Sequence, residues 1–519
     1  MPRRGPWRAL LVLALACGER TPPIADPGPP PPDPEPNRRG RVSALWGESG
    51  EAWRPDGRLP DFSYAGYGMG EVPIPDPPVV AEVSDYGAVG DGVADDTEAF
   101  ERALAEAGEG AIFVPPGRYR VTRPLEIRRS NRVLRGAGRD ETVLFFPRPL
   151  FEVLGRGRHG GPWGWSWGGA FLRVIGEFEE GPELARVTAP ARRGQHRVRV
   201  SSTEHISAGQ WVRVVQTESD GSLSDHLHAG CTFVGTCTIA EPGFRSMDWV
   251  VRVERVEGRS LDFGRPLRLD LRPEWSPRIY PFLPSVEDVG IEHLTVEFPT
   301  TPKPTHHKDR GYNAIELQRV FNGWVRNVRV VNFDNAIHFW YSRYVTGREL
   351  LLEGRGGHYG LGMGGSQDSL MTRFTLRNIS FHDLSLANLA NGCVFSRGRG
   401  PHMNFDHHRG AAYENLFSKL QVGDSWENYR LWKCSDTRSG HFTAARETFW
   451  NIRPQAKKNF IPLWPQINVI GPVIQMRRDR SDLDGMKPWI ESIRPRPADL
   501  HSAQLARRLE ALRGASPTP

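Results

Sequence analysis

The second half of the chain repeats a short apolar strand pattern at an interval that few folds accommodate. Segments such as VRNVRVVNF, GRELLLEG, TRFTLRNISF and YENLFSKLQV follow one another along it. Equivalent core positions are taken at Val328, Leu351, Leu376, Val394 and Leu416, which gives spacings of 23, 25, 18 and 22 residues. A strand repeat of this length predicts a solenoid in which each turn stacks on the last at the strand spacing of about 4.8 Å.

One short helix precedes the strands. In the segment VSDYGAVGDGVADDTEAFERAL, three glycines allow tight turns, Asp95 or Asp96 can cap a helix, and the residues that follow give that helix one apolar face. Short strand-like runs come next, at residues 111–114, 119–121, 125–127 and 132–134. We therefore expect an N-terminal capping helix followed by an all-β coil.

The same region carries a family resemblance. The runs DYGAVGDGVADDTEAF, IFVPPGRYRV and RVLRGAG resemble the opening of the pectate-lyase-like right-handed parallel β-helices. Polygalacturonases, several polysaccharide lyases and phage tailspikes begin in a similar way. The resemblance implies an all-β, right-handed parallel β-helix and a polysaccharide as the partner. It lies on the cap and the early turns, so it assigns no catalytic residue.

Changes in the pattern of apolar residues divide the chain into segments. We expect the β-helix over residues 41–475, interrupted by a small β-rich insertion at about 187–272, where strands such as those at 196–200 and 210–215 occur. A helical tail is expected over 476–519, with Leu505, Leu509 and Leu512 on one helix face. The tail would cap the coil or cover a sheet edge.

The N-terminus reads as an export signal. Residues 1–17 combine a basic start with the short apolar core ALLVLALA and end at Cys17, as in a bacterial lipoprotein signal in which the cysteine is lipidated. The alternative is an ordinary secretory signal. Residues 18–40 are Pro-rich and predict a stiff linker. We expect an exported cell-envelope protein, either an outer-membrane lipoprotein or otherwise secreted, whose only membrane contact is this lipid.

Charge and cysteines add little to the assignment. The net charge is +6, almost all of the positive charge is arginine, and no basic block predicts a nucleic-acid partner. Beyond Cys17 there are four cysteines, an even number in an oxidising compartment, and either disulfides or inert thiols would fit. They are Cys231, Cys237, Cys393 and Cys434.

Strand alternation predicts a polar face. If Ile337, Phe339, Leu361, Met363, Phe381 and Phe405 point into the core, then a ladder of polar side chains points outward. This ladder would comprise His338, His358, His382, Asp406 and His408, with spacings of 20, 24 and 24 residues as far as Asp406. The alternative is a solvent-facing polar stack without function.

The predicted site surrounds this ladder. The candidate catalytic residues are His358, His382, His402, Asp406, His408 and Arg409. The candidate substrate-binding residues are His338, Trp340, Arg397 and Arg399, and Trp163, Trp165 and Trp167 offer further flat faces for a sugar.

Two reactions compete. β-Elimination from a uronic acid needs a base for the proton beside the carboxylate and a cation for the developing charge, roles that suit His and Arg. Hydrolysis needs two carboxylates about 5 Å apart for retention or roughly 6.5–9.5 Å apart for inversion. Asp383 and Asp406 are the candidates, but strand alternation puts them out of phase. A polysaccharide lyase is therefore favoured, with a glycoside hydrolase and a non-catalytic glycan-binding β-helix as the alternatives.

The sequence also bears on whether the protein depends on a metal ion. The calcium-dependent pectate lyases group several carboxylates together, whereas Asp334, Asp368, Asp383 and Asp406 are scattered here. Calcium is therefore the one cofactor that the resemblance allows, and no metal ligand is assigned.

Overall fold

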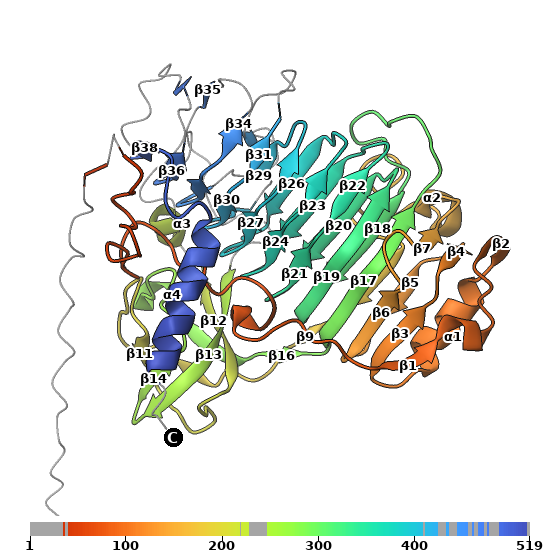
Figure 1. Cartoon of the computed structure of the whole chain (residues 1–519). Helices are drawn as coiled ribbons and strands as arrows, with labels where there is room; N and C mark the ends of the chain where they lie inside the picture. The colour runs from red at the N-terminus through yellow and green to blue at the C-terminus, as the bar shows by residue number, and fades with distance from the viewer. Residues whose placement is uncertain are drawn as a thin grey trace, which may run out of the picture. The chain divides into compact units, whose positions relative to one another are not determined.

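Parallel strands stack into a coil whose turns follow one another in chain order (Figure 1). The computed structural model describes residues 35–36, 40–217, 220–227, 246–407, 410–423, 432–434, 444–454, 459–460, 465–471, 475–476 and 487–515. All of them belong to one compact unit, Pro32–Pro519. The predicted signal, Cys17 and most of the predicted linker lie outside these residues. No described helix is long and apolar enough to cross a membrane.

The turns build three parallel faces, of which the first two are joined through the long strands β17 and β19. The first face contains β1 Val79–Glu82, β3 Gly110–Val114, β6 Arg132–Gly136, β17 Glu287–Glu297, β19 Phe321–Val331, β21 Thr346–Arg348, β24 Leu370–Thr372, β27 Val394–Ser396, β30 Leu416–Ser418, β33 Thr448–Trp450, β36 Asn468–Gly471 and β38 Trp489–Ser492. The second face shares β17 and β19 and adds β2 Asp91–Asp95, β4 Gly117–Arg120, β7 Thr142–Phe145, β22 Leu351–Glu353, β25 Thr375–Leu376, β28 Arg399–Gly400, β31 Gln421–Val422 and β34 Arg453–Pro454.

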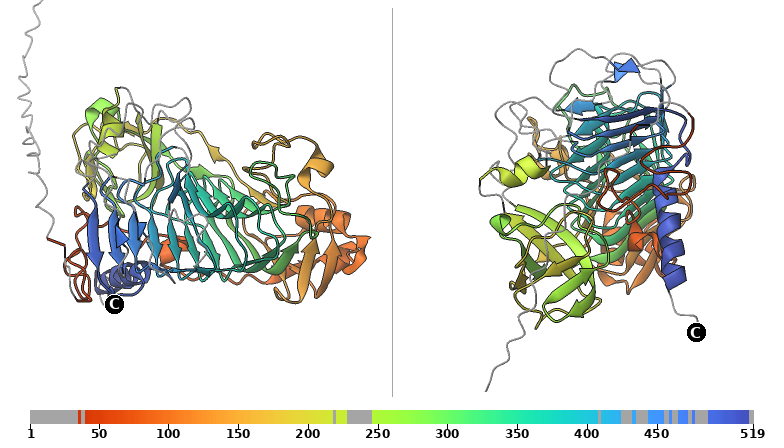
Figure 2. Two further views of the ribbon diagram at one scale, coloured as in Figure 1. Left: turned by 90° about the horizontal axis from the view of Figure 1, so that it is seen from above. Right: turned by 90° about the vertical axis from the view of Figure 1, so that its left-hand side faces the viewer.

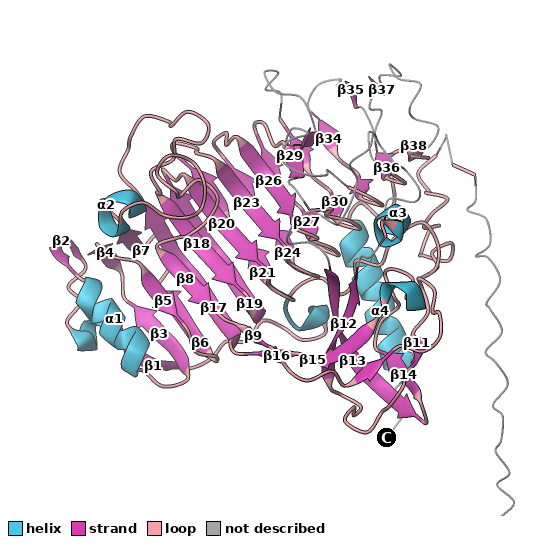
Figure 3. Cartoon of the chain, turned by 180° about the vertical axis from the view of Figure 1, so that it is seen from behind, coloured by secondary structure: helices cyan, strands magenta, loops and turns pink. Residues whose placement is uncertain are grey.

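The third face is a separate eight-stranded sheet, seen from its own side in Figure 3. It contains β5 Leu125–Ile127, β8 Leu172–Ile175, β18 Asn313–Gln318, β20 Asn335–Trp340, β23 Tyr359–Gly364, β26 His382–Ala387, β29 Phe405–His407 and β32 Trp432–Cys434. All of its pairings are parallel and in chain order, which is the arrangement of a right-handed parallel β-helix. The predicted fold class is confirmed.

Stacked apolar side chains fill the coil. On β20, Ile337 and Phe339 have no exposure and pair with Leu361 and Met363 of β23, which in turn pair with two buried leucines of β26. At the N-terminal end, α1 (Thr97–Glu106) buries Phe100 against this core, as the predicted cap requires. The coil therefore owes its stability to inward residues that repeat once per turn.

The repeat assignment needs one correction. Val330, Leu352 and Leu376 are equivalent on the second face, whereas Val394 and Leu416 are equivalent on the first. The predicted series, which used Val328 and Leu351, therefore mixed two faces. The reason is that each turn carries two short strands on adjoining faces, and their apolar patterns look alike in sequence.

The insertion is an antiparallel sheet with a core of its own. Its strands are β10 Ala185–Arg186, β11 Arg197–Arg199, β12 Trp211–Thr217, β13 Ser246–Glu257, β14 Ser260–Phe263 and β15 Arg278–Pro281, with the helix α3 Ser222–Leu227 and the turn η3 Pro273–Trp275. The insertion lies beside the coil (Figure 2). Asp368 of the coil pairs with Arg265 and Arg268 of the insertion, and all three side chains are buried. The pair β9 Phe178–Glu179 and β16 Leu283–Pro284 flanks the insertion.

Two segments from the ends of the chain cover the first face. Leu45, Trp46 and Phe62 from the N-terminal stretch pack with Leu500 of α4 (Leu500–Ala515) against that face (Figure 1). Residues 43–70 are therefore a cover and not turns of the coil. At the other end β38 pairs with β36, so the coil runs past residue 475, where we expected it to end.

The C-terminal helix is present, and Leu505 and Leu509 on the predicted face are half-buried. Leu500, His501 and Gln504 are buried, whereas Leu512 is 48% exposed. The remaining short elements are η1 Tyr67–Gly70, η2 Val83–Tyr86, α2 Leu150–Leu154, β35 Asn459–Phe460 and β37 Gln475–Met476.

Candidate functional site

Histidines from the third face meet two histidines from a loop. His358 directly precedes β23 and His382 begins β26, and their rings stack 5.1 Å apart. The loop between β17 and β18 brings His306 to 4.8 Å from His358 and His307 to 5.1 Å from it, measured between ring centroids. We call His306, His307, His358 and His382 the histidine cluster. The local sequence of β23 and β26 does not predict that this loop lies beside them. The cluster forms because the turns of the coil stack on one another.

Asp309 fixes the ring of His358 from inside the protein. Oδ2 of Asp309 lies 2.7 Å from Nδ1 of His358, and neither side chain has any exposure. Burial raises the pKa of Asp309 to about 6. Because the carboxylate lies at Nδ1, it sets the orientation of the ring, and Nε2 is the second ring nitrogen of His358.

A second carboxylate stands behind His382. Oδ2 of Asp406 lies 3.2 Å from Nδ1 of His382 and accepts a hydrogen bond of 2.8 Å from the Ser385 hydroxyl. On the other side of the ring, Nε2 of His382 lies 3.3 Å from Nε2 of the exposed His306. We call His306, His382 and Asp406 the relay, because their polar atoms follow one another from the surface to a buried carboxylate.

A third imidazole–carboxylate pair lies farther along the same face. Nδ1 of His402 is 2.8 Å from Oδ2 of Asp383, and both side chains are buried. Asp383 is held in turn by the backbone N–H groups of Ser380 and Asn404, at 2.9 Å each. Asp383 is thus fully engaged inside the protein.

The rim of the cluster offers a cation and aromatic faces. Nζ of Lys303 lies 4.8 Å from the centre of the Phe381 ring, and burial lowers the pKa of this lysine. Phe381 in turn lies 5.0 Å from His306. Trp167, which is 42% exposed, stands 5.9 Å from His307. Such a rim suits a sugar that carries a negative charge.

The N-terminal part of the coil matches a known family. Residues 80–147 match the family model described as rhamnogalacturonase A/epimerase, pectate lyase-like. This stretch is similar to that family. It runs from β1 to β7 and contains α1 but none of the histidine cluster, so the match concerns the fold and not the chemistry.

Curated relatives match only short stretches of the chain. The pre-neck appendage protein of Bacillus phage B103 is 47% identical over 64 residues, which are 12% of this chain and 7% of that protein. Mannuronan C5-epimerase AlgE6 of Azotobacter vinelandii is 42% identical over 71 residues, 12% of this chain and 8% of the epimerase. The chain therefore spans less than a tenth of the length of these curated relatives. Among solved structures, the tailspike protein gp49 of Pseudomonas phage LKA1 aligns at a TM-score of 0.46 and 14% identity, over 76% of this chain and 71% of that chain.

The predicted histidine ladder is wrong in register. His338 pairs with Gly362, which pairs with Ser385 and then Asp406, so His358 and His382 are not in its row. The alternation fails because Tyr359 and His382 open their strands, and Phe381 is only half-buried instead of in the core. The rings still gather, since Tyr359 lies 5.1 Å from His338 and 4.7 Å from His382.

His338 is buried, and Trp340 is half-buried against its neighbours. His338 is 4% exposed, and burial, together with the charges of His358 and His382, lowers its pKa to about 3. Trp340 lies over Gly364, where an added Cβ would meet the indole ring at 1.9 Å. The burial of His338 therefore does not support its predicted substrate-binding role, and the role of Trp340 stays a prediction.

Arg397 and Arg399 lie away from the cluster. Arg397 pairs with Asp499 at the start of α4 and donates to Ser502 over 2.7 Å. Arg399 belongs to β28 on the second face and donates to Thr375. The structure does not bring either arginine to the histidines on the third face, because the faces of the coil separate residues that are close in sequence.

Several predicted residues fall outside the described part of the chain. These are Cys17, Cys231, Cys237, His408 and Arg409. Cys434 lies in β32, and its side chain is outside the description. Cys393 is a free, buried thiol whose pKa is raised by burial to about 12.

The scattered acids do not assemble a calcium site. Asp334 pairs with Arg355, Asp368 with Arg265 and Arg268, Asp383 with His402, and Asp406 with His382. Calcium prefers six to eight oxygen ligands, whereas each of these carboxylates already faces a nitrogen partner. Their geometry does not fit the calcium ion that the resemblance allowed.

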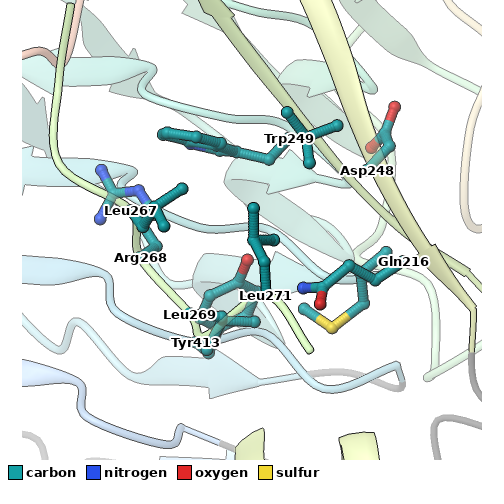
Figure 4. Close-up of a pocket in the computed structure, with 10 residues that line it drawn as sticks. Gln216, Asp248, Trp249, Leu267, Arg268, Leu269, Leu271 and Tyr413 are labelled. Atoms are coloured by element: carbon teal, nitrogen blue, oxygen red, sulfur yellow. The ribbon is translucent and has the colours of Figure 1, made fainter. Parts of the chain in front are cut away.

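A hollow between the insertion and the coil is shown in Figure 4. Trp249, Leu267, Leu269, Leu271 and Tyr413 line it together with Gln216, Asp248 and Arg268. Arg268 is held there by Asp368 and Glu414. The lining residues join the insertion to the coil, and they include no acid–base pair that faces a ligand.

The sequence interpretation missed the loop residues. Lys303, His306, His307 and Asp309 lie in TPKPTHHKDRG, which has no periodic pattern. The doublet of histidines followed by an aspartate was the only signal available. Such a group on a loop between two long strands was a fair site candidate.

Proposed function

We propose that this protein is a carbohydrate-active enzyme that cleaves an acidic polysaccharide by β-elimination at the histidine cluster. One observation carries the proposal. The three carboxylates at the site, Asp309, Asp383 and Asp406, each face a histidine nitrogen and are buried. An approaching glycan therefore meets imidazoles and Lys303, and not a pair of carboxylates.

The chemistry follows from this arrangement. A base removes the proton on the carbon beside the uronate carboxyl, the electron pair forms a carbon–carbon double bond, and the glycosidic oxygen leaves and takes up a proton. His306 is the exposed member of the relay and can take this proton. His382 and Asp406 lie behind His306 and can accept the proton from it. Lys303 supplies positive charge for the enolate-like carboxylate that develops.

Hydrolysis is the weaker alternative. It needs two carboxyl groups that face the scissile bond from opposite sides at about 5 Å or roughly 6.5–9.5 Å. In the register of the third face, Asp406 pairs with Ser385 and not with Asp383. These two carboxylates therefore serve different histidines.

The names of the relatives agree with a uronate substrate. Among the proteins that match part of this chain are mannuronan C5-epimerases and an alginate lyase. Epimerisation and elimination both begin by removing the proton beside the uronate carboxyl. The tailspike of phage AP22 is described in complex with a capsular saccharide.

A screen of glycans tests the proposal. Purified protein is incubated with acidic and neutral polysaccharides, and two signals are recorded, the ultraviolet absorbance of unsaturated products and the appearance of reducing ends. Elimination gives both signals together. Reducing ends without the absorbance establish hydrolysis, and binding without either signal establishes a non-catalytic glycan-binding protein; both results overturn the proposal.

Export is part of the same proposal. The predicted signal and Cys17 would anchor the enzyme through lipid at the bacterial cell envelope, where polysaccharides are accessible. Metabolic labelling with a fatty acid tests this. Wild type should take up label and Cys17→Ser should not, whereas an unlabelled wild type would contradict the anchor.

A further inference from the structure

The loop histidines and His358 converge on one point. His306, His307 and His358 each offer a ring nitrogen, and these atoms all lie within 4.8 Å of one another. We propose that these three residues bind one divalent transition-metal ion, with Zn²⁺ as the reference metal. The inference needs no glycan activity and stands on the ligand geometry alone. With the ion bound, His306 is a ligand, so its role as the base of the proposed elimination belongs to the metal-free protein.

The spacing suits a metal after a small adjustment. Zinc–nitrogen bonds are about 2.0–2.1 Å long, so two imidazole nitrogens on one ion are at most about 4.2 Å apart. His306 and His307 are carried by the loop between β17 and β18 and are exposed, so their side chains can rotate by the difference. His358 is fully buried and fixes one corner of the site.

Asp309 provides the support that metal-binding histidines usually have. It occupies Nδ1 of His358 at 2.7 Å and so leaves Nε2 as the ligand atom of that ring. A carboxylate on the far nitrogen orients the ring and strengthens it as a ligand, and loss of such a partner typically weakens metal binding by about 10–100-fold. A solvent-facing polar stack would not need this buried carboxylate.

The donor set selects the kind of metal. Three neutral imidazoles suit zinc, cobalt, nickel or copper, whereas calcium and magnesium prefer oxygen. Three protein ligands also leave at least one position for water or a substrate oxygen, as in catalytic and unlike structural zinc sites. A bound ion would present a Lewis acid beside Lys303 to an anionic sugar.

Metal titration tests the site directly. Full-length protein without a histidine tag is stripped with a chelator and titrated with Zn²⁺ by calorimetry and with Co²⁺ by visible absorption. We expect one ion per chain. His307→Ala should weaken binding at least about 10-fold, and Asp309→Asn by about 10–100-fold. His205→Ala, at an exposed histidine in the insertion, is the matched control and should bind as wild type does.

The outcomes separate this inference from the proposed function. Equal affinities for wild type and His307→Ala, or no binding of Zn²⁺, Co²⁺ or Ni²⁺ at about 1 mM, would overturn the metal site. Because the affected loop is exposed, His307→Ala should keep the wild-type melting curve. A protein that binds the ion and cleaves no glycan would overturn only the proposed function, and one that cleaves glycan without binding any metal would overturn only this inference.

Discussion

Asp309 and His358 form a hydrogen-bonded pair of 2.7 Å that is sealed from solvent directly beneath two loop histidines. Removing the acceptor leaves a buried imidazole N–H without its carboxylate. We predict that Asp309→Ala lowers the free energy of unfolding by about 1–3 kcal/mol, and that Asp309→Asn, which keeps an acceptor oxygen, costs less. Urea unfolding followed by circular dichroism measures both. Equal losses for the two variants would show that the hydrogen bond is not what stabilises this position.

Asp368 joins the insertion to the coil through two buried arginines. Its neutralisation in Asp368→Asn would leave Arg265 as an uncompensated buried charge and Arg268 with Glu414 as its remaining partner, so we predict a loss of about 3–5 kcal/mol of unfolding free energy. The matched control is Glu101→Gln, since the Arg123–Glu101 pair is 47% and 41% exposed and should contribute less than about 1 kcal/mol. Similar effects for the two substitutions would contradict the structural role given to Asp368.

Arg397 binds α4 and lies away from the histidine cluster. We predict that Arg397→Ala costs about 1–2 kcal/mol of stability, because it removes charge-assisted hydrogen bonds to Asp499 and Ser502, and that glycan cleavage per folded molecule is unchanged. Thermal melts and initial rates provide the two readouts. A normal melt with lost activity would return Arg397 to the substrate-binding role that the sequence suggested.

His338 should make the fold sensitive to acid. Its pKa in the folded protein is about 3, against an ordinary value of 6.5, because burial disfavours the charged ring. Below pH 6.5 the unfolded chain takes up this proton and the folded protein does not. Stability is therefore lost as the pH falls toward 3, by about 1.4 kcal/mol per pH unit for one such group.

The variant His338→Gln isolates this effect. Urea unfolding between pH 6.5 and pH 4 should show a shallower decline for His338→Gln than for wild type, while the exposed-site variant His205→Gln keeps the wild-type slope. Parallel slopes for all three proteins would mean that His338 takes up its proton in the folded protein as readily as in the unfolded chain.

The fold could be predicted well from the sequence because each element of the coil follows a short-range pattern of residues. The cap at Asp95–Leu104 and the apolar alternation of Ile337 and Phe339 are each visible within a few residues. The insertion and the C-terminal helix were also expected from their strand-like and helix-like residue patterns alone.

The site was harder to predict, for two physical reasons. Alternation holds along a strand but not at the residue where the chain bends into it, so His358 and His382 were placed in the wrong row although both belong to the cluster. The loop with His306, His307 and Asp309 follows no period, and only the stacking of turns brings it over β23 and β26. Arg397 and Arg399 do not lie with the histidines, because nearness in sequence does not keep residues on one face.

The most direct test compares wild type with His306→Ala on a polyuronate that wild type cleaves. The relay makes His306 the exposed proton acceptor, so the rate of unsaturated-product formation should fall by about 10²–10⁴-fold in the variant while its melting curve stays unchanged. Unsaturated product formed at the wild-type rate by His306→Ala would contradict the account.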